Sequence, residues 1–261
     1  MIKITSKNNK LIKSVNKLMV DKKYRHLTNL FVAESYRVIE TLVKNKIKIR
    51  NLIISSDSKY FQIAKDYEKN GIDVVILPNI IYNSLTSLAN SDGLIGVFNK
   101  PKDKFNISKN GKYIILDRIQ NPGNLGSIIR TAVGFKMSGL IISNDSVDLY
   151  NPQIIRATMG NCFSIPIKFV TNLNDIIDQL HEQEFKVYAT VVSLSAKKLN
   201  NVDFNHNSIA IVFGNEGNGL KTDILKICDE AIYIPIDSNI NSLNVSVAVG
   251  IILYQLCKQY L

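Results

Sequence analysis

Apolar residues recur along the whole chain with two alternating periods, one of about 3.6 residues and one of about 2. The first is the period of a helix with one buried face, and the second is that of a strand with one buried face. Strand-like runs such as Asp73–Leu77 and Ile209–Phe213 alternate with helix-like runs such as Tyr36–Val43 and Ile80–Leu88. This alternation predicts an α/β fold in which helices cover sheets in layers.

Basic residues are concentrated in the first part of the chain. Residues 1–110 contain 20 Lys and Arg against 9 Asp and Glu, whereas residues 111–261 contain 12 and 13. The polar segment 99–111, which contains Pro, Gly and several lysines, lies at the same place and is typical of a linker. We therefore expect a basic domain over residues 1–105, which holds a polyanion such as RNA, and a second domain over 106–261. The candidates for contact with RNA phosphates are Lys7, Lys10, Lys13, Lys17, Lys22, Lys23 and Arg25. A general lysine bias of the source genome is the alternative explanation.

Cysteines and apolar runs exclude several classes of protein. Cys162, Cys228 and Cys257 are widely spaced, form no CxxC pair and lie near no histidine. This pattern favours neither a disulfide framework nor a metal site, and it suits a reducing cytoplasm, which is the location we expect. Apolar runs such as Ile114–Leu116 fall far below the roughly 18 residues of a membrane-spanning helix. We expect neither a signal peptide nor a membrane segment.

Three segments of the second part have residue patterns typical of ligand sites. Asp117–Ala132 leads from a strand into a helix through two glycines, and the free N–H groups of such a helix start can hold an anion. It lacks both the ending of a P-loop and a complete GxGxxG, which argues against a Rossmann-type nucleotide enzyme. Ile209–Leu220 contains three glycines around Glu216, so either a ligand lies against the main chain or the turn is tight and capped by Asn218.

The third segment, Ile232–Gly250, contains Pro235, a polar loop and the start of an apolar helix that we expect to run from about Val245 to Tyr260. Ser242 is interpreted as its N-cap.

Taken together and in this order, the three segments resemble the signature motifs of the SpoU (TrmH-like) family of RNA 2′-O-ribose methyltransferases, within the SPOUT superfamily. The family pattern is Asn-x-x-x-x-x-Arg, then Phe-Gly-x-Glu-x-x-Gly, then Ile-Pro followed by Ser-Leu-Asn-Val-Ser-x-Ala. The matching residues are Asn124 and Arg130, Phe213–Gly219, Ile234-Pro235 and Ser242–Ala248. Asp148–Pro152 and Arg156–Gly160 are also similar to the family, and Phe31–Leu42 is similar to the accessory substrate-binding domain of its ribosomal RNA members.

The resemblance implies a small N-terminal α/β substrate-binding domain and a C-terminal α/β-knot domain, with a mostly parallel sheet and a trefoil knot. It also implies a homodimer whose active sites take residues from both subunits, and S-adenosylmethionine as cofactor, held mostly by backbone groups. The matching cofactor-binding positions are Thr190, Val191, Gly214, Ile234, Ile236 and Leu243.

The resemblance also assigns catalytic positions. Arg130 is the centre of the reaction in the family and is sometimes described as its general base. A guanidinium with a pKa above about 12 does not accept a proton under ordinary conditions. We therefore expect Arg130 to hold a phosphate and to stabilise the developing alkoxide. Asn124, Ser242 and Asn244 are expected to orient the ribose hydroxyl and the arginine, and Glu216 either to pair with Arg130 or to hold the loops.

Three positions depart from the family pattern, because Ser35, Lys136 and Asp237–Asn239 stand where glycine is usual. Two alternatives stay open. The substrate is ribosomal RNA, most simply that of the large subunit, or transfer RNA. The chain is an enzyme, or it is a catalytically inactive RNA-binding factor of ribosome assembly with the same fold.

Overall fold

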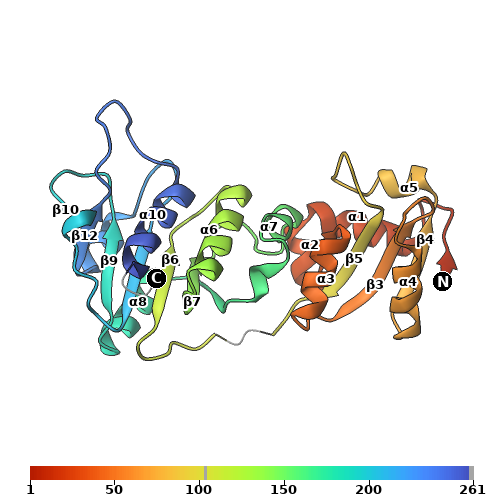
Figure 1. The fold of residues 1–261 in the computed structure, drawn as a ribbon, viewed down its shortest axis with the longest axis horizontal. Helices are drawn as coiled ribbons and strands as arrows, with labels where there is room; N and C mark the ends of the chain where they lie inside the picture. Colours follow the sequence, from red (N-terminus) through yellow and green to blue (C-terminus); the bar gives the residue numbers. More distant parts are fainter. Residues whose placement is uncertain (103–104, 259–261) are drawn as a thin grey trace. The chain divides into compact units, whose positions relative to one another are not determined.

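The structure is a computed structural model that describes residues 1–102 and 105–258. The chain forms two compact units (Figure 1). The N-terminal unit contains Met1–Lys102 and, in addition, Asp148–Phe163, and the C-terminal unit contains the described remainder. We expected a single cut between residues 105 and 106. The structure differs in the segment 148–163, because the side chains of Leu149, Ile154 and Ile155 are buried in the N-terminal unit.

The N-terminal unit is built on a mixed sheet of five strands in the order β1-β4-β3-β5-β2. Its strands are β1 (Ile2–Lys3), β2 (Leu30–Glu34), β3 (Ile49–Ser55), β4 (Asp73–Leu77) and β5 (Leu94–Asn99). Strand β5 pairs antiparallel with both β2 and β3, whereas β4 is parallel to β3 and β1. The helices are α1 (Lys10–Val20), α2 (Lys22–Thr28), α3 (Tyr36–Lys44), α4 (Phe61–Lys69), α5 (Asn79–Asn83) and α7 (Pro152–Ala157), followed by the 3-10 turn η1 (Asn161–Phe163).

The C-terminal unit is built on a seven-stranded sheet in which every pair is parallel, in the order β10-β12-β9-β11-β6-β7-β8. Its strands are β6 (Lys112–Leu116), β7 (Gly139–Ser143), β8 (Ile167–Val170), β9 (Lys186–Thr190), β10 (Lys197–Lys198), β11 (Ile209–Phe213) and β12 (Glu230–Tyr233). The helices are α6 (Pro122–Gly134), α8 (Leu173–Glu182), α9 (Thr222–Ile227) and α10 (Val245–Cys257), with the 3-10 turn η2 (Leu199–Asn201). The expected end of the last helix, at residue 260, lies outside the described residues.

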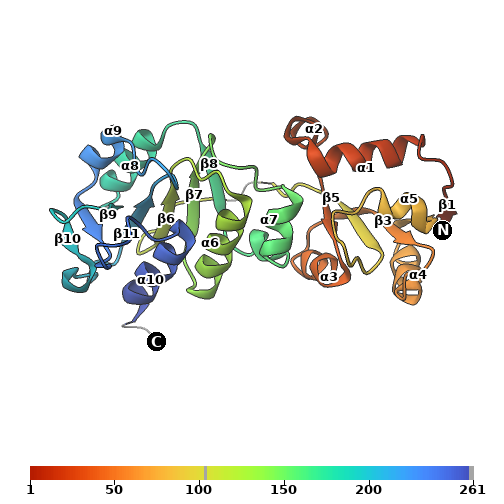
Figure 2. The ribbon, with the colours of Figure 1, turned by 90° about the horizontal axis from the view of Figure 1, so that it is seen from above.

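Helices cover both faces of this parallel sheet (Figure 2). Alternate residues of the central strands, among them Ile115 and Val212, pack against α8 and α9 in one core. Helices α6 and α10 pack against each other on the opposite face. A sheet buried on both faces requires the near-continuous apolar strands that the sequence contains. The mostly parallel α/β architecture expected from the sequence is therefore present, and the trefoil knot stays a prediction.

Two of the positions where family members have glycine adopt left-handed backbone. Ser35 precedes α3 with φ 77°, and Lys136 follows α6 with φ 54°. The amide of Lys136 donates to Val133 O, which closes the last turn of α6. A residue with a Cβ in this conformation costs about 1 kcal/mol or more relative to glycine. The positive φ explains why glycine is usual at both positions. This chain keeps the same conformation with serine and lysine in place of glycine.

Replacing Lys136 by glycine is accordingly expected to stabilise the C-terminal unit by about 1 kcal/mol, which thermal unfolding would register as a higher melting temperature. Gln179→Gly is the control, because Gln179 is exposed in the middle of helix α8, where glycine should destabilise by about 1 kcal/mol. A lower melting temperature for Lys136→Gly would contradict the strain argument.

Candidate active site

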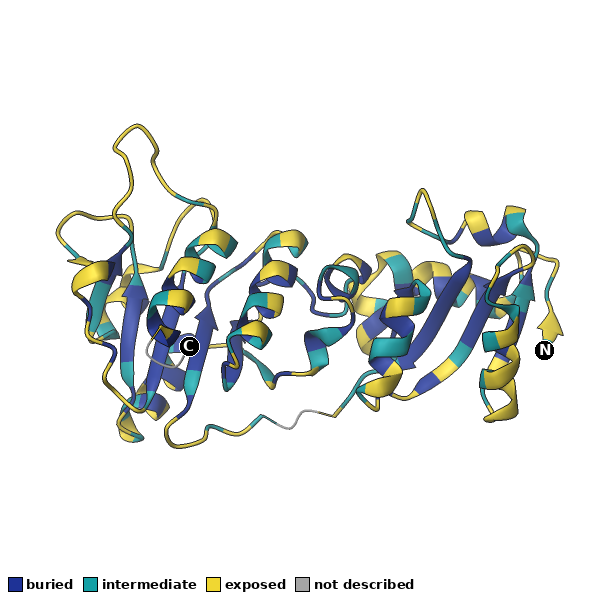
Figure 3. Cartoon of the chain, in the orientation of Figure 1, coloured by how far each residue is buried: buried dark blue, intermediate teal, exposed yellow. Residues whose placement is uncertain are grey.

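The carboxyl ends of β9, β11 and β12 are followed by three loops that enclose a cavity of about 630 Å³. All six expected cofactor positions, Thr190, Val191, Gly214, Ile234, Ile236 and Leu243, line it. Ligands bind at this end of the strands in open parallel α/β sheets because the helices there begin and the loops diverge. The loop after β12 is exposed (Figure 3), and so are the apolar side chains of Val192, Leu194 and Ile240 at the cavity.

The loop after β11 folds back on itself at the cavity wall. Asn215 and Gly219 exchange backbone hydrogen bonds of 3.1 and 3.0 Å, and the Asn215 side chain accepts from the amides of Gly217 and Asn218. A Cβ on Gly214 would lie 2.3 Å from the carbonyl carbon of Gly219. The capping residue is therefore Asn215, so the interpretation of Asn218 as the cap is wrong. Gly214 is required by the turn itself, apart from any ligand.

A second cavity, of about 700 Å³, adjoins the first and has a polar wall. The two cavities share Glu216, Ser242 and Leu243. Asn244 Nδ2 donates to Asn124 Oδ1 at 3.0 Å, and Asn124 Nδ2 donates to Glu216 Oε1 at 3.0 Å. Two of the three positions expected to orient the hydroxyl, Asn124 and Asn244, therefore meet with Glu216 in one hydrogen-bonded row, although Asn124 is 92 residues from Glu216 and 120 from Asn244 in the chain.

Glu216 holds the loops at this row. Its carboxylate accepts from the backbone amides of Gln120 at 3.2 Å and Asn121 at 3.1 Å, as well as from Asn124. Partial burial by itself raises the pKa of Glu216, but the hydrogen bonds from Asn124 and from the backbone amides outweigh burial and lower the pKa below its usual 4.5. These hydrogen bonds favour the second of the two roles expected for Glu216, and no bond joins it to Arg130 among the described residues.

The lowered pKa of Glu216 predicts a pH-dependent contribution to stability. The carboxylate should stabilise the fold fully above pH 4.5, and this contribution should be lost as the pH falls through the lower folded-state pKa. Glu216→Gln is therefore expected to unfold at lower urea concentration than the wild type at pH 7, with the two midpoints converging at a pH below the folded-state pKa of Glu216. Midpoints that differ equally at both pH values would contradict a stabilising role of the charge.

Within residues 1–102 and 105–258, Ser242 and Arg130 have no such partners. Ser242 is exposed in the loop that lines both cavities. The N-cap of α10 is Asn244, whose side chain accepts from the amide of Ser246 at 2.8 Å, so the N-cap interpretation of Ser242 is wrong. Arg130 is exposed on α6 and makes no hydrogen bond or ion pair with any residue of 1–102 or 105–258. It stands six residues after Asn124, which is about 9 Å along the helix axis.

The ion pair of Asp117 and Arg118, which connects the first motif to the second, was not identified from the sequence. The Asp117 carboxylate is buried and binds the guanidinium of Arg118, whose Nη2 also donates to Gly219 O at 3.0 Å. Asn215 Nδ2 donates to Arg118 O at 2.8 Å. The hydrogen bond to Asp117 raises the pKa of Arg118. An acidic and a basic residue at a strand end are too common to be noticed in a sequence, because only the fold brings them to the glycine loop.

The basic residues expected to contact RNA are found mostly on the surface. Lys7, Lys10, Lys13, Lys17, Lys22 and Lys23 are exposed. Arg25 is an exception, because its guanidinium is buried and donates to Asp148 at 2.7 Å and to Leu18 O at 2.8 Å. The inclusion of Arg25 among the RNA-contacting candidates is therefore wrong.

No helix in the described part of the chain is both long and apolar enough to cross a lipid bilayer. The same part contains no group of three or more His, Cys, Asp or Glu side chains placed to hold a metal ion.

Comparisons with known proteins match both units. Residues 111–254 match the SpoU rRNA Methylase family, and residues 9–96 match the MRM3-like substrate binding domain. The chain is 29% identical over 256 residues to 23S rRNA (guanosine(2553)-2′-O)-methyltransferase RlmP of Bacillus subtilis, covering 98% of this chain and 99% of that protein. It is 35% identical over 149 residues to 23S rRNA (guanosine-2′-O-)-methyltransferase RlmB of Acinetobacter baylyi, covering 57% and 60%.

Solved structures with a similar fold are also methyltransferases. An AdoMet-bound rRNA methyltransferase from Sinorhizobium meliloti has a TM-score of 0.87 at 28% identity, over 99% of this chain and 98% of that one. The SpoU methyltransferase AviRb from Streptomyces viridochromogenes, at 22% identity and a TM-score of 0.87, shows the shared fold. The family, the mostly parallel α/β architecture and the cofactor expected from the three motifs are confirmed. The chain belongs to the SpoU rRNA Methylase family and is an S-adenosylmethionine-dependent RNA 2′-O-methyltransferase.

Proposed function

We propose that this enzyme methylates a ribose 2′-hydroxyl of large-subunit ribosomal RNA, as a homodimer in the cytoplasm. The observation that carries the proposal is the pair of adjoining cavities, one with the expected cofactor positions and one with a polar wall of Asn124, Glu216 and Asn244. The named relatives that act on 23S rRNA and the match of residues 9–96 to a substrate-binding domain support the ribosomal substrate. A reducing cytoplasm suits its three free cysteine thiols.

The first cavity fits S-adenosylmethionine in chemical terms. Its lining combines polar residues such as Thr190 and Ser242 with apolar ones such as Val191, which suits a ligand with both an apolar ring and polar groups. Bound there, S-adenosylmethionine supplies the methyl group and the sulfur leaving group.

The second cavity receives the ribose in this proposal. Asn124 and Asn244 hold each other through the 3.0 Å hydrogen bond, which limits the orientations open to both amides beside the hydroxyl. Ser242 lines both cavities and lies at the passage between cofactor and ribose. Arg130 provides the positive charge that stabilises the alkoxide as it forms and holds an adjacent phosphate.

A homodimer would explain why Arg130 has no partner among the described residues of its own subunit. Exposed residues follow one stripe of α6 at Gly123, Ser127, Arg130 and Gly134, and all except Arg130 are small. On the neighbouring α10, Val247, Ile251 and Tyr254 are exposed at 50, 37 and 56%. Small residues beside exposed apolar ones form a surface suited to close packing against a second copy. In the proposed dimer, Arg130 of the partner subunit completes the row of Asn124, Glu216 and Asn244.

Complementation between subunits tests this arrangement. Arg130→Ala and Asn124→Ala homodimers should both be inactive, and mixing them under conditions of subunit exchange should restore part of the activity, because one of the two sites in each mixed dimer is intact. Tyr254→Glu should convert the dimer to a monomer in sedimentation experiments and lose methyl transfer. A monomeric wild type, or mixed dimers without activity, would overturn the shared site.

The ribosomal substrate is tested by mapping 2′-O-methyl groups in total RNA from cells with and without the gene. We expect one site in large-subunit ribosomal RNA to lose its methyl group and to regain it when the purified enzyme is added. Loss of a mark in transfer RNA alone would replace the proposed substrate. Unchanged marks throughout would contradict the proposal.

A further inference from the structure

Arg118 lies just after strand β6, and its backbone is held in an uncommon conformation. Its φ is 55°, in the left-handed region that a residue with a Cβ adopts only at a cost. Its amide donates to Ser143 Oγ at 2.8 Å, and its carbonyl accepts from Asn215 Nδ2 at 2.8 Å and from Gln120 Nε2 at 3.2 Å. Such strain persists where neighbouring groups fix the residue, and it clusters at sites that bind ligands.

The guanidinium of Arg118 binds the main chain of the glycine loop, residues 214–220. Its Nη2 donates to Gly219 O at 3.0 Å and to Asp117 Oδ2 at 2.8 Å, and its Nε donates to Asp117 at 3.1 Å. Asp117 is 1% exposed, so its carboxylate fixes the guanidinium from inside the fold. A lysine could not reproduce this contact, because only a planar guanidinium binds a carboxylate at two points and still offers a donor to a third group.

The carbonyl that Arg118 holds belongs to the tightest contact of the glycine loop. A Cβ on Gly214 would lie 2.3 Å from the carbonyl carbon of Gly219 and 2.7 Å from its oxygen. Gly219 has φ 63°, and its amide donates to Asn215 O at 3.0 Å. The peptide of Gly219 therefore sets the position of Gly214, and both glycines line the first cavity.

The glycine loop is held from two sides, and Arg118 holds the side of the first cavity through Gly219. On the side of the second cavity, Glu216 accepts from the amides of Gln120 and Asn121. Neither member of the ion pair is among the residues that line the two cavities. The pair therefore acts on a ligand only through the loop.

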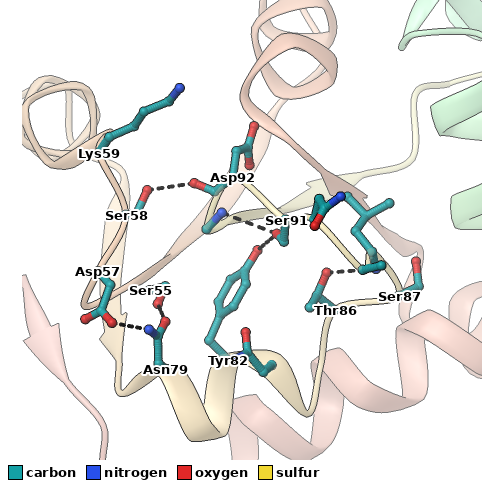
Figure 4. Close-up of a pocket in the computed structure, with 15 residues that line it drawn as sticks. Ser55, Asp57, Ser58, Lys59, Asn79, Tyr82, Thr86, Ser87, Ser91 and Asp92 are labelled. Carbon is teal, nitrogen blue, oxygen red and sulfur yellow. Dashed lines mark hydrogen bonds between the residues drawn. The ribbon is translucent and has the colours of Figure 1, made fainter.

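The loop between α5 and β5 in the N-terminal unit shows the reverse arrangement of a buried ion pair. There the carboxylate of Glu34, which is 3% exposed, accepts directly from Thr86 Oγ1 at 2.5 Å, and Arg156 neutralises it at 3.9 Å. Figure 4 shows this loop beside the cavity of that unit, with the Tyr82 hydroxyl 2.7 Å from Ser91 Oγ. In the glycine loop, by contrast, the arginine makes the contact and binds a main-chain carbonyl. The guanidinium there can be removed without changing any residue of the loop.

We propose that Arg118 is a positioning residue for S-adenosylmethionine, which holds the Gly219 carbonyl so that the glycine loop is ordered before the cofactor binds. A loop that is already ordered loses less conformational entropy when its ligand arrives, and the affinity is higher for that reason. Asp117 neutralises the guanidinium, so the pair adds no net charge near a cofactor whose sulfonium is cationic. The inference rests on the proposed function, since it takes the first cavity as the place of the cofactor.

Removing the guanidinium tests the proposal in the full-length enzyme. By calorimetry, Arg118→Met should raise the Kd for S-adenosylmethionine by at least about tenfold, because the loop then has to become ordered on binding. The KM for the cofactor should rise by a similar factor, whereas kcat at saturating cofactor should stay within about threefold, since Glu216 still holds the other side of the loop. Lys226→Met is the matched control, because it removes an exposed cation of α9 that does not line the cavities. Its Kd should match that of the wild type.

Two further variants separate the loop contact from a general loss of structure. Asp117→Asn combined with Arg118→Met leaves no unpaired buried charge and should show the same loss of affinity as the single variant. In Arg118→Ala, millimolar ethylguanidinium should restore part of the affinity, which it would not do for a misfolded protein. A Kd for Arg118→Met and for the double variant equal to that of Lys226→Met would overturn the proposal. A fall in kcat with an unchanged KM for the cofactor would overturn it as well, because Arg118 would then act on the reaction.

The place of the cofactor is tested separately in the isotope-labelled wild type. S-adenosylmethionine should shift the amide resonances of Gly217 and Gly219, which line the first cavity. No shift at these residues would contradict the proposed cavity itself. Shifts there together with equal affinities of Arg118→Met and Lys226→Met would contradict only the role of Arg118, so the two failures are distinguishable.

Discussion

Replacing Arg130 by alanine is expected to lower methyl transfer by about 10² to 10³-fold, because a fixed charge at the developing alkoxide is lost. The affinity for S-adenosylmethionine should stay within about threefold of the wild type, because Arg130 does not line the cavity that holds the expected cofactor positions. Single-turnover kinetics with saturating RNA would measure the first quantity, and calorimetry the second.

A second variant, Arg130→Lys, separates the effect of the charge from that of the guanidinium geometry. It retains the charge but not the planar pair of donors that holds a phosphate, so we expect activity between those of the wild type and Arg130→Ala. Sedimentation should show the same oligomeric state for all three proteins, which excludes an indirect loss through the α6 surface. Activity of Arg130→Ala within threefold of the wild type would remove Arg130 from the mechanism.

Replacing Gly214 by alanine is expected to lower the affinity for S-adenosylmethionine by at least about 100-fold. The new methyl group would lie 2.3 Å from the Gly219 carbonyl carbon and 2.4 Å from the Leu220 nitrogen. Both neighbours are backbone atoms, so the loop that forms the cavity wall has to open. Calorimetry with S-adenosylmethionine measures the loss, and thermal unfolding establishes that the unliganded variant is folded.

Gly217 offers a matched control in the same loop. A Cβ there would have no neighbour closer than Asn215 Oδ1 at 3.6 Å, and its φ is not in the left-handed region. Gly217→Ala should therefore bind S-adenosylmethionine nearly as well as the wild type. Similar affinities for both variants would show that the turn at Gly214 is more tolerant than its geometry indicates.

Much of the fold was predictable because its elements have regular periods. The strands Asp73–Leu77 and Ile209–Phe213 were predicted with their observed bounds. The helix expected over Ile80–Leu88 ends at Asn83, because Glu34 binds Thr86 and Ser87 from across the unit. Helix α7 was not predicted. Its segment belongs to the N-terminal unit because it packs against residues far away in sequence, and the local hydrophobic period carries no information on such contacts.

The candidate site was predictable as a set of motifs but not as a set of contacts. All expected cofactor positions line one cavity, and Asn124, Glu216 and Asn244 meet in one row. The sequence does not show that Arg118, held by Asp117, binds the glycine loop at Gly219. It also does not show that Asn215 and Asn244 are the capping residues, because these contacts depend on how the loops fold. The roles of these residues in catalysis stay predictions until the variants are measured.

The segment 148–163 belongs to the N-terminal unit although it follows the first strands of the C-terminal unit in sequence, and this order affects folding during synthesis. The ring of Phe31 packs against those of Tyr150 and Phe163, with centroids 5.5 and 5.4 Å apart. The ribosome synthesises chains at about 5–20 residues per second and domains tend to fold as they emerge. When Lys102 emerges, the ring of Phe98 already packs against Phe31, but the rings of Tyr150 and Phe163 have not yet been made. The nascent unit thus carries an uncovered apolar surface for several seconds, at which chaperones or premature association would act.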